Sequence, residues 1–578
     1  MENYMKNFNR WLDSPVVDQE TKNELKSLSG NEKEIEERFY RDLEFGTAGM
    51  RGTLGAGTNK MNIYMVRKAT QGVATHILSL GENAAKKGIL IGYDTRNFSR
   101  EFAEETAKVL VANGINVYLF DTVHSVPEVS FAIRTLGTSA GVMITASHNP
   151  KEYNGYKVYG SDGGQLPPDA ADVVTKAINS FDIFNDIKIC SWDEAKNSGK
   201  LEIVGETLNK QFLDTIEKLQ INPDAVEKVK DTFNIVYTPL HGTGSRPVQA
   251  ILKRIGFENL LVVKEQDTED GNFPTVKSPN PEDKEAFEIA IKIAKEQNVD
   301  LIIGTDPDCD RVGIVVRDAS GVYQTLTGNQ TGALLCEYIL ESLKKKGTLP
   351  ENGVIIKTIV TTELAKAIAD AYGVEIMNVL TGFKYIGEKM TEFSKTGSHT
   401  YLIGFEESYG YLVGTHARDK DAVVASMLIA EMAAYYKAEG LSLYEVMQNI
   451  YKKYGYFAER TVSFTMPGKD GMEKMAELLK NIRNNPPESV DGKGIISMWD
   501  YKTQIIKNKN GIDGKITDLP KADVMKFILD DEKSYFIIRP SGTEPKIKFY
   551  LSSVADTQAD ANKNIENILA DLKEKFSL

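Results

Sequence analysis

The chain has 578 residues, of which 41% are hydrophobic and 26% are charged, so it is long enough for several domains of ordinary globular composition. Its formal net charge of −13 argues against a general nucleic-acid-binding surface but is compatible with a local basic pocket for a small anion. Three cysteines without disulfide or zinc spacing, and the lack of an apolar run suited to a signal core or a membrane span, predict a cytoplasmic protein that binds neither nucleic acid nor membrane.

The first forty residues are polar with scattered apolar positions, and we expect helices that lie on the surface of the part that follows. Three glycines then fall within residues 45–52, where they permit a close approach of the backbone to a ligand. Arg51 lies among them and carries forked donors that suit phosphate. A flexible loop with a solvated arginine is an equally good interpretation of this stretch taken alone.

Residues 64–120 alternate between helix and strand patterns, as in a parallel sheet covered by helices, with Ser99 as a candidate helix cap. The pattern continues through an apolar strand over residues 140–144. This strand ends in Thr145-Ala146-Ser147-His148-Asn149-Pro150. We expect Ser147 to be exposed on a loop at the end of the strand, the usual place for chemistry on such sheets, with His148 as a neighbouring base or donor. A polar loop with a satisfied histidine is the alternative.

Two further α/β units begin near residues 233 and 328, and each has a polar loop at the end of a strand. The first of these loops is Asp306-Pro307-Asp308-Cys309-Asp310-Arg311. The other is Gly404-Phe405-Glu406-Glu407-Ser408-Tyr409-Gly410, preceded by an expected glycine-bearing loop over residues 379–387. From about residue 452, alternating segments predict an antiparallel sheet and a final helix. The expected fold is therefore three successive α/β mixed-sheet domains (1–212, 213–322 and 323–450) plus a C-terminal α+β domain (451–578).

Asp306, Asp308 and Asp310 alternate along the chain, so in an extended loop their side chains project to one side. Three converging carboxylates repel one another unless a cation neutralises them, and hard oxygen ligands suit Mg²⁺. A solvated acidic turn is disfavoured because apolar strands flank the loop. Cys309 is a poor ligand for so hard an ion, and Arg311 is placed to steady a phosphate beside it.

The loop over residues 539–548 combines cationic, hydroxyl and amide donors that together suit a phosphate dianion. These donors belong to Arg539, Ser541, Gly542, Thr543 and Lys546. Glu406 and Ser408 place an acceptor and a hydroxyl together, a combination that suits sugar hydroxyls. A basic β-turn and a helix cap are the respective alternatives.

In this order the four loops resemble the α-D-phosphohexomutase family, and within it the bacterial phosphoglucomutase branch. The resemblance extends over nearly the whole chain, including residues 45–52. It implies four domains around a central cleft and an intramolecular phosphotransferase, an isomerase of glucose metabolism that interconverts glucose 1-phosphate and glucose 6-phosphate. It also implies one Mg²⁺ per chain, small-molecule sugar phosphates as partners, and glucose 1,6-bisphosphate as intermediate and activator. We expect a monomer or a weak homodimer.

The resemblance assigns roles to the matching residues. Ser147 is carried as phosphoserine, and Mg²⁺ is held by Asp306, Asp308, Asp310 and a phosphoserine oxygen. The sugar-binding residues are Glu406 and Ser408, with Thr381, Gly382 and Lys384 in a second sugar loop. Arg539, Ser541, Gly542 and Thr543 grip the phosphate that is not reacting, and Lys546 follows them. The residues similar to phosphate-contacting or acid/base positions of the family are Arg51, His148, Lys157, Arg311 and Lys420.

Several rival functions stay open at this point. Phosphomannomutases, phosphoglucosamine mutases and phosphopentomutases share the motifs, because Glu406 and Ser408 suit a hexose without fixing its epimer. A Mg²⁺-dependent phosphatase would also use an aspartate-rich loop, but it would need water access and no distal phosphate grip. A non-catalytic sugar-phosphate sensor is expected to lack Ser147 or one of the three aspartates, and the chain has them all.

Overall fold

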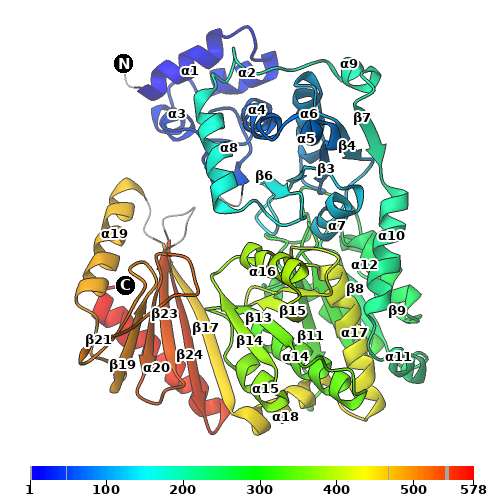
Figure 1. Cartoon of the computed structure of the whole chain (residues 1–578), viewed down its shortest axis with the longest axis vertical. Coiled ribbons are helices and arrows are strands. Elements are labelled where there is room, and N and C mark those ends of the chain that lie inside the picture. The colour runs from blue at the N-terminus through cyan, green and yellow to red at the C-terminus, as the bar shows by residue number, and fades with distance from the viewer. Residues whose placement is uncertain (1–2, 47–48, 466–467, 541–545) are drawn as a thin grey trace.

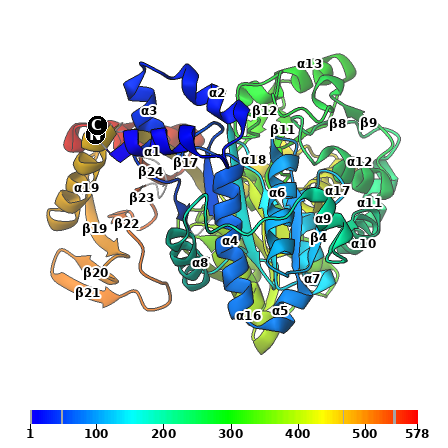
Figure 2. The ribbon, with the colours of Figure 1, turned by 90° about the horizontal axis from the view of Figure 1, so that it is seen from above.

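A computed structural model describes residues 3–46, 49–465, 468–540 and 546–578 of the chain. Its elements form four sheets in sequence order, and we call each sheet with its helices a unit (Figure 1). The view from above places the fourth unit, the last along the chain, to one side of the other three (Figure 2). Three mixed α/β units followed by an antiparallel unit with helices are the predicted fold class, which is confirmed. No helix among the described residues is long and apolar enough to cross a membrane.

The first unit is built on a seven-stranded mixed sheet with strand order β1-β2-β6-β5-β3-β4-β7. Its strands are β1 (Phe45–Gly46), β2 (Gly49–Thr53), β3 (Ile89–Tyr93), β4 (Val117–Phe120), β5 (Ala140–Ile144), β6 (Tyr153–Gly160) and β7 (Leu201–Val204). Its helices are α4 (Ile63–Ser79), α5 (Glu82–Lys87), α6 (Ser99–Ala112), α7 (Val126–Leu136), α8 (Pro168–Ser180), α9 (Trp192–Asn197) and α10 (Glu206–Ile216). β3 and β5 are parallel neighbours, so their carboxyl ends and the loops that follow lie side by side.

Alternate side chains of the central strands of this sheet enter different cores. Ile89 and Ile91 of β3 pack with α4 and α6, whereas Leu90 packs with α7. Both faces are therefore covered, as the continuous apolar runs of these strands require. Three N-terminal helices, α1 (Asn3–Asp13), α2 (Gln19–Ser27) and α3 (Glu32–Phe39), cover part of the unit as predicted. Trp11 of α1 meets the ring of Phe39 of α3 edge-on at 5.7 Å and the ring of Tyr64 of α4 edge-on at 5.2 Å, and so packs α1 against both helices.

The second and third units share one continuous core. The second sheet has the order β12-β11-β10-β8-β9 and the third β14-β13-β15-β16. The second comprises β8 (Ile235–Thr238), β9 (Leu260–Val262), β10 (Leu301–Thr305), β11 (Val312–Arg317), β12 (Tyr323–Leu326), α11 (Pro223–Val229), α12 (Ser245–Arg254) and α13 (Glu288–Gln297). The third comprises β13 (Gly353–Thr358), β14 (Glu375–Val379), β15 (Thr400–Glu406), β16 (Gly410–Val413), α14 (Gly328–Lys345), α15 (Leu364–Tyr372), α16 (Phe383–Thr396), α17 (Ala422–Ala438) and α18 (Leu443–Tyr454). α17 is buried along nearly its whole length because it packs against elements of both units.

The fourth unit is an antiparallel sheet with its own core. Its strands are β17 (Tyr456–Thr465), β18 (Ser489–Val490), β19 (Lys493–Asp500), β20 (Ile505–Asn508), β21 (Gly511–Lys515), β22 (Met525–Leu529), β23 (Tyr535–Pro540) and β24 (Lys546–Ala555), and its helices are α19 (Gly468–Asn484) and α20 (Gln558–Phe576). A separate apolar cluster joins it to the third unit through residues such as Ile359 and Tyr535.

Two local predictions are wrong. The segment over residues 379–387 is mostly helix: β14 ends at Val379, and α16 begins at Phe383, directly after Gly382 with its φ of 115°. Ser99 does not cap its helix but is the first residue of α6, since Phe98 holds the cap position with φ 67°. The Ser99 hydroxyl instead donates to Asp94 Oδ1 at 2.7 Å.

Candidate active site

Ser147 lies in the loop that follows β5, where the chain turns back toward β6. Its backbone has φ 52°, a left-handed conformation that few residues other than glycine adopt. Thr145 stabilises this conformation, because its Oγ1 accepts a hydrogen bond from the Ser147 backbone N–H at 2.8 Å. The prediction that Ser147 is exposed is wrong: the residue is 3% exposed, since the second unit packs against its loop.

The Ser147 hydroxyl points at the aspartate loop of the second unit. Its Oγ donates to Asp306 Oδ2 at 2.8 Å and lies 3.2 Å from Nδ1 of His148. Burial lowers the pKa of His148 well below its ordinary value, and the charges of Arg311 and Arg51 act in the same direction. The predicted serine, histidine and aspartate therefore meet at one point, although Ser147 and Asp306 lie 159 positions apart in the chain.

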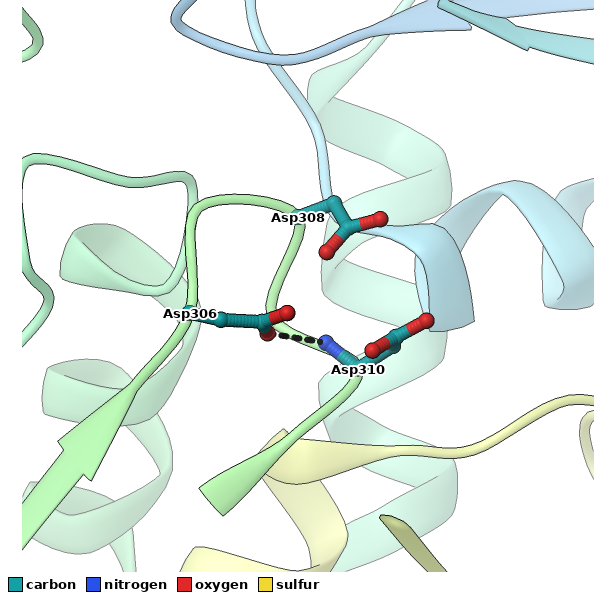
Figure 3. Close-up of side chains that lie close together, drawn as sticks. All are labelled: Asp306, Asp308 and Asp310. Carbon is teal, nitrogen blue, oxygen red and sulfur yellow. Dashed lines mark hydrogen bonds between the residues drawn. The ribbon is translucent and has the colours of Figure 1, made fainter. Parts of the chain in front are cut away.

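The three aspartates occupy the connection between β10 and β11, and all three are buried (Figure 3). They converge through a tight turn, so the expected extended loop is wrong. Asp306 Oδ1 accepts the backbone N–H groups of Asp310 at 3.1 Å and Arg311 at 3.0 Å, and Cys309 adopts φ 53°. One oxygen from each carboxylate lies within 4.8 Å of the other two.

This donor set fits a hard divalent cation. Within the described part of the chain, Asp308 Oδ1 and Asp310 Oδ1 are buried without a hydrogen-bond partner. Such orphaned acceptors are costly unless another group engages them. Burial, together with the charges of Asp308 and Asp310, raises the pKa of Asp306 well above its usual range. Carboxylate oxygens are the ligands that Mg²⁺ prefers, so the buried triad has the chemistry of a metal site.

Two lysines from different units reach the triad. Lys157 on β6 places Nζ 2.8 Å from Asp308 Oδ2, and Lys420, before α17, places Nζ 3.2 Å from Asp310 Oδ2. Burial acts to raise the pKa of Asp310, but the charges of Lys420, Lys157 and Arg311 lower it below its ordinary value. The first, second and third units thus each contribute charged side chains to one buried cluster.

Arg51 and Arg311 lie at the edges of this cluster. Arg51 on β2 donates from Nη1 to Asn149 Oδ1 at 3.2 Å, beside the serine loop. Arg311 donates from Nη1 to Glu282 Oε1 at 2.7 Å. Forked guanidinium groups in these positions are suited to a phosphate that approaches Ser147.

The predicted sugar-binding residues gather at the carboxyl ends of β14 and β15. Glu406 is the last residue of β15, and its Oε1 accepts the backbone N–H of Gly382 at 3.0 Å. Thr381 and Lys384 flank Gly382, and burial lowers the pKa of Lys384. Ser408 follows in the turn between β15 and β16. Lys420 connects this group to the triad, since its Nζ lies 5.6 Å from the ring centroid of Phe383.

The predicted phosphate grip lies on the fourth unit. Arg539 is on β23 and donates from Nη1 to the Tyr550 hydroxyl at 3.5 Å, while Lys546 begins β24. Ser541, Gly542 and Thr543 lie outside the described residues. Among the described residues, no hydrogen bond or ion pair joins Arg539 to Ser147 or to the aspartates. The structure therefore brings together the groups of the first three units, and the role of the fourth-unit loop stays a prediction.

Sequence reasoning missed two polar groups of the site. Glu282 binds Arg311, and Asp419 accepts from Gln165 at 2.9 Å and from Tyr159 at 3.2 Å, which links the third unit to the first. Both lie in irregular segments between elements, and their partners are more than 25 positions away. The one local feature that could have indicated Asp419 is the run of four charged residues from Arg418 to Asp421.

Comparisons with known proteins agree with this geometry. Three family models match, described as phosphoglucomutase/phosphomannomutase, alpha/beta/alpha domains I, II and III, over residues 42–182, 210–321 and 327–454. The phosphoglucomutase of Staphylococcus haemolyticus is 37% identical over 536 residues, which cover 92% of this chain and 94% of that protein.

Two solved structures share the fold. The Paramecium phosphoprotein pp63/parafusin, a phosphoglucomutase in its open form, has a TM-score of 0.67 at 18% identity and covers 93% of this chain and 95% of its own. The Aspergillus fumigatus N-acetylphosphoglucosamine mutase, in complex with GlcNAc-6P and magnesium, has a TM-score of 0.50 at 12% identity and covers 99% of each chain.

Proposed function

Because the chain belongs to the phosphoglucomutase/phosphomannomutase family, we propose that it is a phosphoglucomutase that interconverts glucose 1-phosphate and glucose 6-phosphate. The observation that carries the proposal is the buried contact of 2.8 Å between Ser147 Oγ and Asp306 Oδ2. It joins a hydroxyl to a carboxylate triad with unsatisfied oxygens, which is an arrangement for phosphoryl transfer. The 37% identity to a phosphoglucomutase over nearly the whole chain supports glucose phosphates as substrates.

Asp306, Asp308 and Asp310 would hold the metal ion together with an oxygen on Ser147. We assign Mg²⁺, because the site offers only hard oxygen ligands, and a solved structure of the same fold is a complex with magnesium. When bound, the ion supplies neutralisation of the charge on the phosphoryl oxygens. Lys157 and Lys420 would add fixed positive charge on the protein side of the same site.

In the forward direction, the phosphorylated Ser147 would give its phosphoryl group to the 6-hydroxyl of glucose 1-phosphate. The P–O bond to Ser147 breaks, the bond to O6 forms, and the proton of the sugar hydroxyl passes to a neighbouring group. The candidate is His148, because its lowered pKa leaves the imidazole neutral and its Nδ1 lies 3.2 Å from Ser147 Oγ. The product of this step is glucose 1,6-bisphosphate. After the bisphosphate turns over, the bond between its 1-phosphoryl group and O1 breaks, the bond to Ser147 forms again, O1 takes up a proton, and glucose 6-phosphate is released. Free bisphosphate would also act as activator, because it can phosphorylate a Ser147 that has lost its phosphoryl group. Alignment and charge neutralisation supply most of the catalysis in such transfers.

The remaining residues would hold the sugar and its second phosphate. Glu406, Ser408 and the segment Thr381, Gly382 and Lys384 face the sugar hydroxyls, and Arg51 and Arg311 contact the reacting phosphate. Arg539 and Lys546, with Ser541, Gly542 and Thr543, would grip whichever phosphate is not reacting. A separate grip is needed because the sugar phosphate must bind in two orientations.

A panel of substrates tests this function against its rivals. Purified protein with Mg²⁺ and a trace of glucose 1,6-bisphosphate is given glucose, mannose or ribose 1-phosphate, and isomerised sugar phosphate and free phosphate are both measured. We expect the highest kcat/KM for glucose 1-phosphate and little free phosphate. Preferred turnover of the mannose or ribose ester would move the assignment to a phosphomannomutase or phosphopentomutase. Free phosphate as the main product would indicate a phosphatase.

A further inference from the structure

Arg96 lies beneath the Ser147 loop and binds much of its backbone. It follows β3, whose carboxyl end is next to that of β5, and it is 3% exposed. Its Nη1 donates to the carbonyl oxygens of Pro150 at 2.9 Å and Tyr153 at 3.0 Å, and its Nη2 donates to those of Ser147 and Asn149 at 2.5 Å each. One guanidinium therefore binds three carbonyl oxygens of the loop that carries the proposed nucleophile and a fourth at the start of β6.

The guanidinium is itself held in place from the first unit. Asp94 Oδ2 lies 3.5 Å from Arg96 Nε, and Asp94 Oδ1 accepts the backbone N–H of Arg96 at 3.0 Å. Ser99 donates to the same Oδ1 at 2.7 Å. Both charged groups are buried, and the negative charge of Asp94 offsets part of the cost of burying the Arg96 guanidinium. Because Nε faces Asp94, the Nη1 and Nη2 atoms of Arg96 point toward the Ser147 loop and donate to its carbonyl oxygens.

The second unit closes this arrangement from the other side. The Arg96 guanidinium carbon lies 5.0 Å from the ring centroid of Phe273, which is fully buried and has φ 46°. A Cβ atom on Gly271 would lie 2.4 Å from the backbone nitrogen of Asn97, so the two segments touch without space for a side chain. Ser278 Oγ also donates to the His148 carbonyl oxygen at 2.8 Å. The segment over residues 271–278 thus contacts both Arg96 and the Ser147 loop.

We propose that Arg96 and Phe273 are positioning residues that hold the Ser147 loop against the aspartates across the boundary between the first and second units. This inference rests on the proposed role of Ser147 as the phosphoryl carrier. The reason is geometric. Ser147 has an unfavourable backbone conformation that only surrounding contacts maintain, and in-line transfer depends on its distance from the acceptor. Arg96 and Phe273 belong to the first and second units, whereas the proposed sugar loops belong to the third. Substitutions of these two residues are therefore expected to slow phosphoryl transfer without weakening the binding of the sugar.

The test compares Phe273→Leu with Phe257→Leu. Both phenylalanines are 1% exposed and belong to the second unit, but the ring of Phe257 packs near that of Phe233, in the core shared by the second and third units. The control variant should therefore lose similar packing. We expect Phe273→Leu to lower kcat by about tenfold or more, because small misplacements of a reacting group have effects of this size. KM for glucose 1-phosphate should change by less than about twofold, since the proposed sugar loops are intact.

The rate of Ser147 phosphorylation gives a readout that a merely structural role would not change. Dephosphorylated enzyme is mixed with glucose 1,6-bisphosphate and Mg²⁺, and intact mass is followed with time. We expect slower phosphate uptake by Phe273→Leu than by wild type or Phe257→Leu, at a temperature where circular dichroism shows all three folded. Arg96→Lys should be at least as slow, because one ammonium cannot replace a fork that reaches four carbonyls. If Arg96→Lys does not fold, Gly271→Ala is the alternative. Its added Cβ would push the second unit away from Asn97 and so disturb the same contact between the two units.

The activity of the wild-type protein distinguishes a failure of the positioning role from a failure of the proposed function. If wild-type protein isomerises glucose 1-phosphate and takes up phosphate on Ser147, but Phe273→Leu and Gly271→Ala match Phe257→Leu in kcat and in uptake, the positioning role is overturned. If wild-type protein neither isomerises the substrate nor takes up phosphate, the proposed function has failed and this inference fails with it.

Discussion

The site around Ser147 and the loop around Arg539 are attached to the rest of the molecule in different ways. The first site is assembled from three units whose buried side chains interlock, as in the pairs Lys157–Asp308 and Lys420–Asp310. The fourth unit has its own core and meets the third through a separate apolar cluster and through Phe457, which packs into the core of the second and third units. The stacking of Tyr456 on Tyr451 at 5.8 Å and the ion pair of Lys526 with Glu363 at 3.4 Å add to this junction. Figures 1 and 2 both place it to one side.

This difference suits the two tasks that we assign. Buried charge pairs resist displacement, because separating them leaves an uncompensated charge in a medium of low polarity. A phosphoryl carrier beside a metal site needs such rigidity. A grip that binds either phosphate of a turning substrate needs freedom to approach and withdraw. A junction made mainly of apolar contacts allows this at lower free energy than a set of buried charge pairs does. Substitutions at each of the two regions test the comparison.

Replacing Ser147 with alanine should have the largest effect. We expect mutase activity to fall by roughly a thousandfold or more, because the proposed phosphoryl carrier is lost. The free energy of unfolding should fall by only about 1–3 kcal/mol, for the lost hydrogen bond to Asp306. Coupled assay and intact mass are the measurements, with the exposed Ser180→Ala on α8 as control. Normal turnover by Ser147→Ala, or a retained phosphate, would remove the nucleophile assignment.

Loss of the metal site should come next. Asp308→Asn removes one carboxylate charge at almost constant size. Lys157 loses the charge that faces its Nζ at 2.8 Å but keeps Asp310 at 3.5 Å. We expect metal affinity and kcat to fall by about ten- to a hundredfold, and prolonged chelation of wild-type protein to abolish activity until Mg²⁺ is restored. Titration of activity against free Mg²⁺ measures both. Activity that survives chelation would show that the triad serves another purpose.

Arg539→Ala examines the grip on the fourth unit. We expect kcat/KM to fall by roughly ten- to a hundredfold in both directions, since a charge-assisted contact is worth about 1.5–3 kcal/mol. Much of the loss should appear in KM, because the grip binds ground state and transition state alike. Arg460→Ala is the matched control, as Arg460 on β17 makes a partly exposed ion pair with Glu566. Unchanged kinetics with both glucose phosphates would leave the fourth unit without its proposed role.

Lys526→Gln should have the smallest effect and tests the junction itself. The side chain is 14% exposed and bridges to Glu363, which retains Lys357 as a partner at 3.3 Å. We expect the free energy of unfolding to fall by about 1 kcal/mol or less and kcat to change only a few-fold, since the apolar cluster is intact. Thermal melts and steady-state kinetics check this. A loss as large as that of Asp308→Asn would mean that the junction is as rigid as the metal site.

Much of the candidate site was predictable because its chemistry is local in the sequence. Apolar runs that end in polar loops identify strand ends, and the loops around Ser147, Asp306, Glu406 and Arg539 carry their donors and acceptors within a few residues. The units and their order follow from the same alternation. The first residues and caps of helices were predicted less accurately, as at Phe383 and Ser99. A single residue with positive φ, Gly382 or Phe98, sets where each helix begins, and the sequence pattern does not reveal it.

The tertiary structure alone decided how these loops meet. Ser147 is buried because the second unit covers its loop, and the aspartates converge through a turn that Cys309 makes with φ 53°, which alternation along the chain does not reveal. The pairing of Lys157 with Asp308 and the contact of Arg96 with Phe273 join residues 151 and 177 positions apart. Sequence patterns report neighbours along a helix or strand, whereas these contacts depend on how separately folded units pack, and only the packed chain contains that information.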